Sequence, residues 1–295
     1  MIYMDQLEQI KKLAIIAMFS DDDLMDILVL KGGNAIDIVY GIASRSSLDL
    51  DFSMATEFNP ADMSSIKSKF EKALNRVFKE AGYKVFDIRF GERPEDSGPD
   101  VPSFWGGYRL EFKLIDKTKY AELEKDEQRL RLSAVDVGPG ARKTYRIEIS
   151  KWESCNSKHA ATLDDYTVYV YTPTMIVFEK IRAICQQMPE YSKFLGKSYE
   201  TARARDFFDI HTVVEHFRIN LTTNGNLSLL RDIFKAKEVP LNLIGSIKDF
   251  REYHRPDFIA VENTVKRNIR IKDFDYYFDY VVKKCDKLLE ALGKI

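Results

Sequence analysis

The stretch VLKGGNAIDIVYGIASRSSLDLDFSM, residues 29–54, decides the fold of this chain. The pattern predicts a short apolar strand over Asp26–Leu30, a glycine pair, a few helical turns, and a second strand that carries Asp49 and Asp51. Successive side chains of a strand point to opposite faces, so the two aspartates share one face, about 6–7 Å apart along the strand. The apolar residues on the other face, which we expect to face the core, are Leu48, Leu50 and Phe52.

The two halves of this stretch together indicate a site for a metal-bound nucleoside triphosphate. Carboxylates held side by side on a strand repel each other unless a cation lies between them. Two glycines before a helix start let backbone N–H groups approach a phosphate closely, although a glycine pair alone can also form a plain turn. The stretch is neither a Walker loop nor a dinucleotide fingerprint, because the required glycine spacings are absent.

The composition is that of a globular protein with a sizeable core. The chain has 295 residues, 45% hydrophobic and 31% charged, which predicts two domains. A net charge of −1 excludes a global basic field, so any nucleic acid must be bound by a local patch. No secretory leader or membrane-spanning run is expected, and three scattered cysteines indicate a reduced, cytoplasmic protein.

The character of the chain changes near residue 172. Before it, strand patterns such as Lys143–Ser150 and Asp165–Tyr171 alternate with helices. After it, Thr172-Pro173 opens a helix, 189–197 is expected to be a loop, and Tyr199–Phe217 is expected to be helical. We therefore predict an α+β fold, with a mixed sheet and flanking helices over residues 1–172 and a C-terminal helical bundle over 173–295.

Three further charged residues are candidates for the site. Glu148 shares a polar strand face with Arg146, and if its strand neighbours that of Asp49, three acids converge, which suits two Mg²⁺ ions. The alternative is an exposed acidic strand face. Lys180 is either a cation that holds a triphosphate or a plain surface lysine. Asp206 lies next to core positions and needs a partner. Arg205 and Asp209, four residues apart on a helix, fit a surface ion pair of little energetic weight.

In this order, the motifs resemble the AbiEii/AbiGii toxin nucleotidyltransferases of the DNA polymerase beta-like nucleotidyltransferase superfamily. The matching segments are Leu30-Lys31-Gly32-Gly33-Asn34-Ala35, Arg45-x-Ser47-x-Asp49-x-Asp51-Phe52, Arg146-x-Glu148, Glu179-Lys180-Ile181 and Arg203-x-Arg205-Asp206-x-x-Asp209-Ile210. The resemblance implies a minimal polymerase-beta-like sheet domain with a helical bundle behind it. Asn34 replaces the usual Thr or Ser, and Arg146-x-Glu148 replaces the usual Lys-x-Asp.

The resemblance also implies roles for individual residues. The implied metal ligands, for Mg²⁺ or Mn²⁺, are Asp49, Asp51 and Glu148. The implied catalytic residues are these three with Lys180 and Asp206. The implied nucleotide-binding residues are Lys31, Gly32, Gly33, Asn34, Ser47, Lys180 and Arg205.

The function that we expect is transfer of a nucleoside monophosphate from an NTP to an acceptor, as the toxin of a bacterial toxin–antitoxin or abortive-infection system. The resemblance implies a cognate antitoxin as partner and, by analogy, tRNA as acceptor. Two alternatives remain open: an enzyme that modifies a protein or a small molecule, and an inactive NTP-binding protein. Two basic clusters, one over 193–205 and one over 266–272, are candidate RNA contacts or solvated helix faces.

Overall fold

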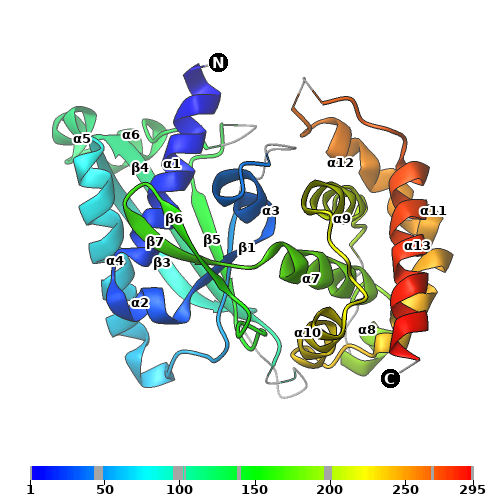
Figure 1. The fold of residues 1–295 in the computed structure, drawn as a ribbon. Helices are drawn as coiled ribbons and strands as arrows, with labels where there is room; N and C mark the ends of the chain where they lie inside the picture. Colours follow the sequence, from blue (N-terminus) through cyan, green and yellow to red (C-terminus); the bar gives the residue numbers. More distant parts are fainter. Residues whose placement is uncertain are drawn as a thin grey trace.

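A mixed sheet forms the first half of the molecule. The computed structural model describes residues 2–42, 49–95, 102, 104–137, 141–195, 201–266 and 269–293. Within them, seven strands form one sheet in the order β3-β4-β5-β2-β1-β7-β6 (Figure 1). The strands are β1 (Val29–Lys31), β2 (Leu50–Ser53), β3 (Tyr83–Arg93), β4 (Gly107–Asp116), β5 (Tyr145–Ser150), β6 (His159–Leu163) and β7 (Tyr166–Val170). β2 is parallel to β5 and antiparallel to β1, and β1 is parallel to β7, so the predicted mixed sheet is confirmed.

Two long helices cover the apolar face of this sheet. These are α1 (Ile2–Phe19) and α4 (Met63–Glu80), which lie side by side on it (Figure 1). Leu50 and Phe52 are buried beneath them, as expected, and the rings of Phe52 and Phe19 lie 5.9 Å apart. Aspartates on the same strand as these residues therefore point to the opposite face. The core thus fixes which way the acidic pair points.

Short elements connect the strands. They are α2 (Asp22–Ile27), α3 (Gly32–Asn34), the π-helical turn η1 (Ala35–Val39), the 3-10 turn η2 (Pro60–Asp62), α5 (Lys117–Leu123) and α6 (Glu127–Leu132). The predicted strand over Asp26–Leu30 is wrong at its start, because it begins only at Val29. The Asp21 side chain accepts a hydrogen bond from the Leu24 N–H and so starts a helix that extends through Ile27.

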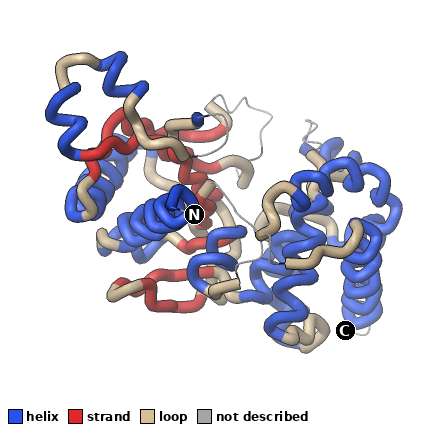
Figure 2. Tube along the Cα trace, turned by 90° about the horizontal axis from the view of Figure 1, so that it is seen from above, coloured by secondary structure: helices blue, strands red, loops and turns tan. Residues whose placement is uncertain are grey.

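The second half is helical and lies beside the sheet (Figure 2). Its elements are α7 (Pro173–Cys185), α8 (Pro189–Leu195), α9 (Ala204–Phe217), α10 (Asn224–Lys235), η4 (Leu241–Phe250), α11 (Arg251–His254), η5 (Arg255–Phe258), α12 (Ile259–Glu262) and α13 (Phe274–Leu292). Thr172 caps α7 through the Met175 N–H, and Pro173 takes the first helical position, as predicted. The C-terminal helical part of the predicted fold class is confirmed.

Three details of the sequence interpretation are wrong. Residues predicted as a loop form α8, because Pro189 suits the first position of a helix. The helix expected from Tyr199 begins at Ala204. β6 was not expected, since His159–Leu163 is a short polar edge strand that pairs only with β7 among the described strands.

The two halves share one hydrophobic core. Buried residues form a continuous cluster that extends from Leu7 in α1 to Leu288 in α13. Polar contacts also cross between the halves, since the Lys266 ammonium lies 3.2 Å from a Glu8 carboxylate oxygen and 3.4 Å from one of Asp37. The division into domains at residue 172 stays a prediction.

Candidate active site

Four charged side chains lie in one row across the centre of the sheet. Lys31 on β1 is opposite Asp51 on β2, Asp51 is opposite Glu148 on β5, and Glu148 is opposite Arg109 on β4. Lateral neighbours in a sheet project from the same face. The condition for Glu148 to join the aspartates, namely that its strand neighbours theirs, is therefore met.

The three acids are held in different ways. Asp49, at the entry to β2, accepts a hydrogen bond from Arg142 at 2.7 Å, and Glu148 accepts one from Arg109 Nε at 2.8 Å. Asp51 is the most desolvated of the three. The pKa of its carboxyl is raised to about 6, mainly by burial; Glu179 and Asp49 also act to raise it, whereas Lys31 acts to lower it. A carboxylate in this position is stabilised by an added cation.

The glycine pair lies directly against Asp51. Gly32 has a φ of +72°, and a Cβ at this position would lie 2.7 Å from Asp51 Oδ2. Glycine alone combines this backbone conformation with so close an approach. Gly32 and Gly33 both line the cavity described below, where their backbone can face a ligand.

Asn34, unlike the two glycines, does not line the cavity. Its side chain is fully buried, and its Nδ2 donates to the backbone carbonyl of Asp49 at 2.6 Å. Asn34 is not part of the cavity lining, so the structure places it behind the site as a support for the acidic strand. Ser47, the other polar residue implied to contact nucleotide, lies outside the described residues.

The helical half supplies the second wall. Lys180 on α7 lies 2.8 Å from a carboxylate oxygen of Asp206 and 2.8 Å from one of Asp209, both on α9. All three are buried, so Lys180 is not a plain surface lysine. We expected Asp209 to form a surface ion pair with Arg205, and this is wrong, because Asp209 is buried and pairs with Lys180. Arg205 is exposed at the cavity wall.

These residues surround one cavity of about 900 Å³ between the sheet and the helical half. The charged and polar lining from the sheet half includes Lys31, Asp49, Asp51, Arg93, Arg109, Glu148, Ser150 and Glu153. The lining from the helical half includes Glu179, Lys180, Arg182, Gln186, Arg203, Arg205, Asp206 and Lys237. The structure thus brings together the predicted residues of both halves, Asn34 and Ser47 excepted.

Charge is unevenly distributed over this lining. Asp49, Asp51 and Glu148 lie together on the sheet wall, with Arg109 beside them. Elsewhere the lining is basic, with Lys31, Arg93, Lys180, Arg182, Arg203, Arg205 and Lys237 against Glu153, Glu179 and Asp206. An acidic area next to a larger basic one suits a ligand that carries both a metal cation and a chain of phosphates.

A model of the family described as nucleotidyl transferase AbiEii toxin, type IV TA system, matches residues 14–280. The chain belongs to the AbiEii family. It is accordingly a nucleotidyltransferase of a toxin family, and the resemblance inferred from the motifs is confirmed. No protein among curated sequences is significantly similar to it.

Solved structures of low sequence identity are similar to the chain over most of its length. A candidate nucleotidyltransferase of Helicobacter pylori is 16% identical, with a TM-score of 0.52 over 98% of this chain and 97% of that one. JHP933 of Helicobacter pylori is 18% identical, with a TM-score of 0.49 over 98% and 94%. The nucleotidyltransferase toxin MenT4 of Mycobacterium tuberculosis is 16% identical, with a TM-score of 0.48 over 96% and 83%.

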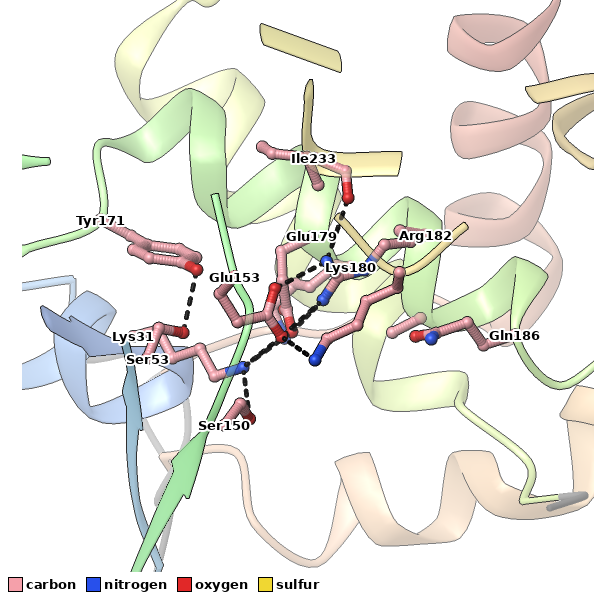
Figure 3. Close-up of polar contacts among 12 residues, drawn as sticks. Lys31, Ser53, Ser150, Glu153, Tyr171, Glu179, Lys180, Arg182, Gln186 and Ile233 are labelled. Carbon is pink, nitrogen blue, oxygen red and sulfur yellow. Dashed lines mark hydrogen bonds and ion pairs between the residues drawn. The ribbon is translucent and has the colours of Figure 1, made fainter. Parts of the chain in front are cut away.

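The AbiEii-family motifs leave out a second charged group in the cavity. Glu153, Arg182 and Lys237 are buried there, and the Glu153 carboxylate lies at ion-pair distance from Arg182, Lys237 and Lys31 (Figure 3 shows Glu153, Arg182 and Lys31). Arg182 had a signal in the sequence, because a charge within the apolar helix of residues 173–185 needs a buried partner. Glu153 and Lys237 had none, since both lie outside helices and strands.

The carboxylates of this AbiEii-family site have the right chemistry for a divalent metal. Oxygen ligands from aspartate are those that Mg²⁺ takes in proteins, and Asp51 is a desolvated carboxylate beside a second acid. Across the described residues, however, no three His, Cys, Asp or Glu side chains are grouped so that they could hold a metal ion. Arg142 and Arg109 draw Asp49 and Glu148 into ion pairs. A metal held by Asp51 together with Asp49 or Glu148 therefore requires that the arginine ion pair of that second acid is exchanged.

In the described ranges, no helix combines the length and the apolar character needed to cross a bilayer.

Proposed function

We propose that the protein transfers a nucleoside monophosphate from an NTP to the acceptor end of tRNA, with the aid of Mg²⁺ or Mn²⁺, and that this makes it the toxin of a toxin–antitoxin pair. The observation that carries the proposal is the distribution of charge over the cavity, with three acids on one wall and mainly cations elsewhere. The AbiEii family supports an NTP substrate and a cognate antitoxin.

Each part of the cavity has a task in this reaction. Asp49 and Asp51 would hold the metal, which when bound supplies neutralising charge at the α-phosphate and a lowered pKa for the attacking hydroxyl. Gly32 and Gly33 offer backbone N–H groups to phosphate oxygens. Asp206 and Asp209 hold the Lys180 ammonium in a fixed position, from which it contacts the nucleotide. Preorganised charge of this kind lowers the barrier without a cost of reorganisation.

Glu148 is proposed as the third acid of the site. It lies in register with Asp51 on the neighbouring strand, but its carboxylate is bound to Arg109. It can contribute to metal binding once that ion pair is exchanged. In its present position, the pair of Glu148 and Arg109 forms part of the cavity lining.

The test is transfer of label from NTPs to bacterial total RNA, with each NTP and with Mg²⁺ or Mn²⁺. We expect labelled tRNA with the unaltered protein and none with Asp49→Ala/Asp51→Ala. The matched control is Asp22→Ala/Asp26→Ala, which removes two exposed acids that are not part of the cavity lining. Label on protein or on small molecules in place of RNA would support the alternative acceptors, and no label under any condition would count against the enzyme.

The toxin part has its own measurement. Expression of the unaltered protein should slow growth, and the double alanine variant should not, at equal protein levels. Equal slowing by both proteins would contradict a toxin that acts through this site.

A further inference from the structure

A buried carboxylate lies at the centre of a cluster of cations in the cavity. Glu153 accepts two hydrogen bonds from Arg182, at 2.7 and 3.1 Å, and lies 3.6 Å from Lys31 Nζ and 3.8 Å from Lys237 Nζ. Figure 3 shows Arg182 and Lys31 pointing toward it from α7 and β1. Its side chain is 3% exposed, and despite burial the three cations lower the pKa of its carboxyl to about 2.

The cluster holds more positive than negative charge. Within the described residues, Glu179 is the second acid at ion-pair distance, 3.3 Å from Lys31 and 3.6 Å from Arg182. At ion-pair distance, three cations thus face two carboxylates, and the five side chains are only 3–18% exposed. A buried excess charge is unfavourable unless a counterion joins it. The cluster is therefore suited to an anion.

Unused hydrogen-bond donors are also present around the cavity. The Nε atom of Arg182 is buried and has no hydrogen-bond partner in the described structure, and the same is true of Nε in Arg93 and Arg203. All three arginines line the cavity. Buried donors are normally satisfied, so their accumulation at one cavity points to a missing ligand rich in acceptor oxygens.

The position of Lys31 indicates which part of a nucleotide the cation cluster would bind. Lys31 precedes Gly32 and lies in register with Asp51, so it connects the acidic wall to the cation cluster. A triphosphate whose α-phosphate is at the aspartates would extend its outer phosphates toward Glu153. In the transfer, the acceptor oxygen bonds to the α-phosphorus, its proton leaves to solvent, and the bond to the β-phosphate oxygen breaks with its electron pair on the departing pyrophosphate.

We propose that Lys31, Arg182 and Lys237, positioned by Glu153, form the binding site for the pyrophosphate group, both as the outer phosphates of the NTP and as the product. This rests on the proposed function. Glu153 acts here as a positioning residue, since it works through the cations that it holds. Lys237 brings the helical half into the site, because its ammonium also donates to the carbonyls of Phe104 and Lys151 in the sheet half.

Binding of inorganic pyrophosphate to the full chain, measured by titration calorimetry, tests this assignment. Lys237→Met removes the charge and keeps the stem, and it should weaken binding about tenfold or more, the effect of one charge-assisted hydrogen bond. Lys235→Met, at an exposed lysine two residues earlier, should bind as the unaltered protein does. Circular dichroism melts establish that both variants are folded. Equal affinity in the two variants, or no binding by the unaltered protein, would overturn the assignment.

The Glu153→Gln variant tests whether Glu153 positions the cations or acts only through its negative charge. If charge alone mattered, loss of a carboxylate would strengthen pyrophosphate binding. We expect weaker binding and a raised KM for NTP, because an amide cannot hold Arg182 and two lysines together. Glu238→Gln, an exposed neighbour of Lys237, is the control and should leave both values unchanged. Unchanged or tighter binding by Glu153→Gln contradicts its positioning role.

The outcomes also separate this inference from the proposed function. Nucleotidyl transfer that persists with an unchanged KM for NTP in Lys237→Met would refute the pyrophosphate site and leave the enzyme intact. Pyrophosphate binding that depends on Lys237, in a protein that labels no acceptor, would confirm the site and count against the transfer reaction.

Discussion

Asp51 occupies a position that is useful for binding and unfavourable for stability. Its carboxyl is desolvated against Gly32, close enough to Glu179 and Asp49 that both raise its pKa. Such a side chain contributes little to the free energy of folding, because burial and like charges oppose its ionised form. A residue kept at this cost is typical of a functional site.

Asp51→Asn should separate activity from stability. We expect nucleotidyl transfer to fall at least about a hundredfold, because the proposed metal ligand is lost. The melting temperature should stay unchanged or rise, because the amide removes the repulsion with Asp49. Asp249→Asn, at an exposed aspartate, is the control for both measurements. A markedly lower melting temperature for Asp51→Asn would show that the carboxylate is mainly structural.

The sequence was informative about residues that share a local pattern and silent about residues that meet only in three dimensions. Asp49 and Asp51 are two apart on one strand, and the motifs placed Lys180 and Asp206 in the same site. The role of Asn34 depends on its hydrogen bond to Asp49, fifteen residues away. Glu153 could not be found from the sequence, because its partners come from residues 31, 182 and 237.

At the scale of elements, the junction of β1 and α3 is constrained by the acidic strand that packs against it. Gly32 and Gly41 both have positive φ, +72° and +68°, but only at Gly32 does another group occupy the space where a Cβ would be. Gly41→Ala therefore carries the cost of backbone strain alone, on the order of 1 kcal/mol. Gly32→Ala has the same cost of backbone strain and, in addition, a steric clash of the new Cβ with Asp51.

Gly32→Ala should be more damaging than Gly41→Ala in two respects. We expect a larger loss of unfolding free energy in urea denaturation and a loss of transfer, because Asp51 must move. Gly41→Ala should retain transfer. Similar activity in both variants would show that the turn tolerates a side chain, and the close approach of Gly32 to Asp51 would then have no role in the site.

The start of α9 depends on side chains from another segment. The Arg203 N–H donates to His254 Nδ1 at 3.1 Å, and the Ala204 N–H donates to Asp257 at 3.0 Å. These residues lie about fifty positions later in the chain and replace the local N-cap that most helices use. Hydrophobic periodicity shows where a helix can form, but it does not show a distant partner that fixes its first residue. The sequence therefore predicted a start at Tyr199.

His254 should make stability depend on pH. The pKa of its ring is lowered to about 4, mainly because burial disfavours the charged form. Arg203 also acts to lower this pKa, whereas Asp206 acts to raise it. Between pH 6.5 and 4 the unfolded chain binds more protons at this position than the folded one, so its contribution to stability is lost as pH falls. The loss by pH 4.5 should be on the order of 2 kcal/mol.

The measurement is urea unfolding at pH 7 and pH 4.5. His254→Gln should show a smaller loss between these two pH values than the unaltered protein, since it has no ring to protonate. His216→Gln, at an exposed histidine, should show the full loss. An equal loss in all three proteins would contradict the assignment to His254.

For the whole molecule, the shared core predicts cooperative unfolding. Hydrophobic contacts extend from α1 to α13 without interruption, and Lys237 and Lys266 make polar contacts from the helical half to the sheet half. Differential scanning calorimetry should therefore show one transition, with equal calorimetric and van't Hoff enthalpies. Two separated transitions would instead support independent domains divided near residue 172.

The cluster around Glu153 has a consequence for synthesis on the ribosome. Its cations come from residues 31, 182 and 237, and the chain emerges N-terminus first, at about 5–20 residues per second. A nascent chain that ends before Lys237 has the acidic strand and the glycine turn but lacks one side of the pyrophosphate site. Ribosome-stalled chains of such length are expected to be inactive in the transfer assay. The tRNA that serves the synthesis of this chain would then stay unmodified by it until translation has passed Lys237.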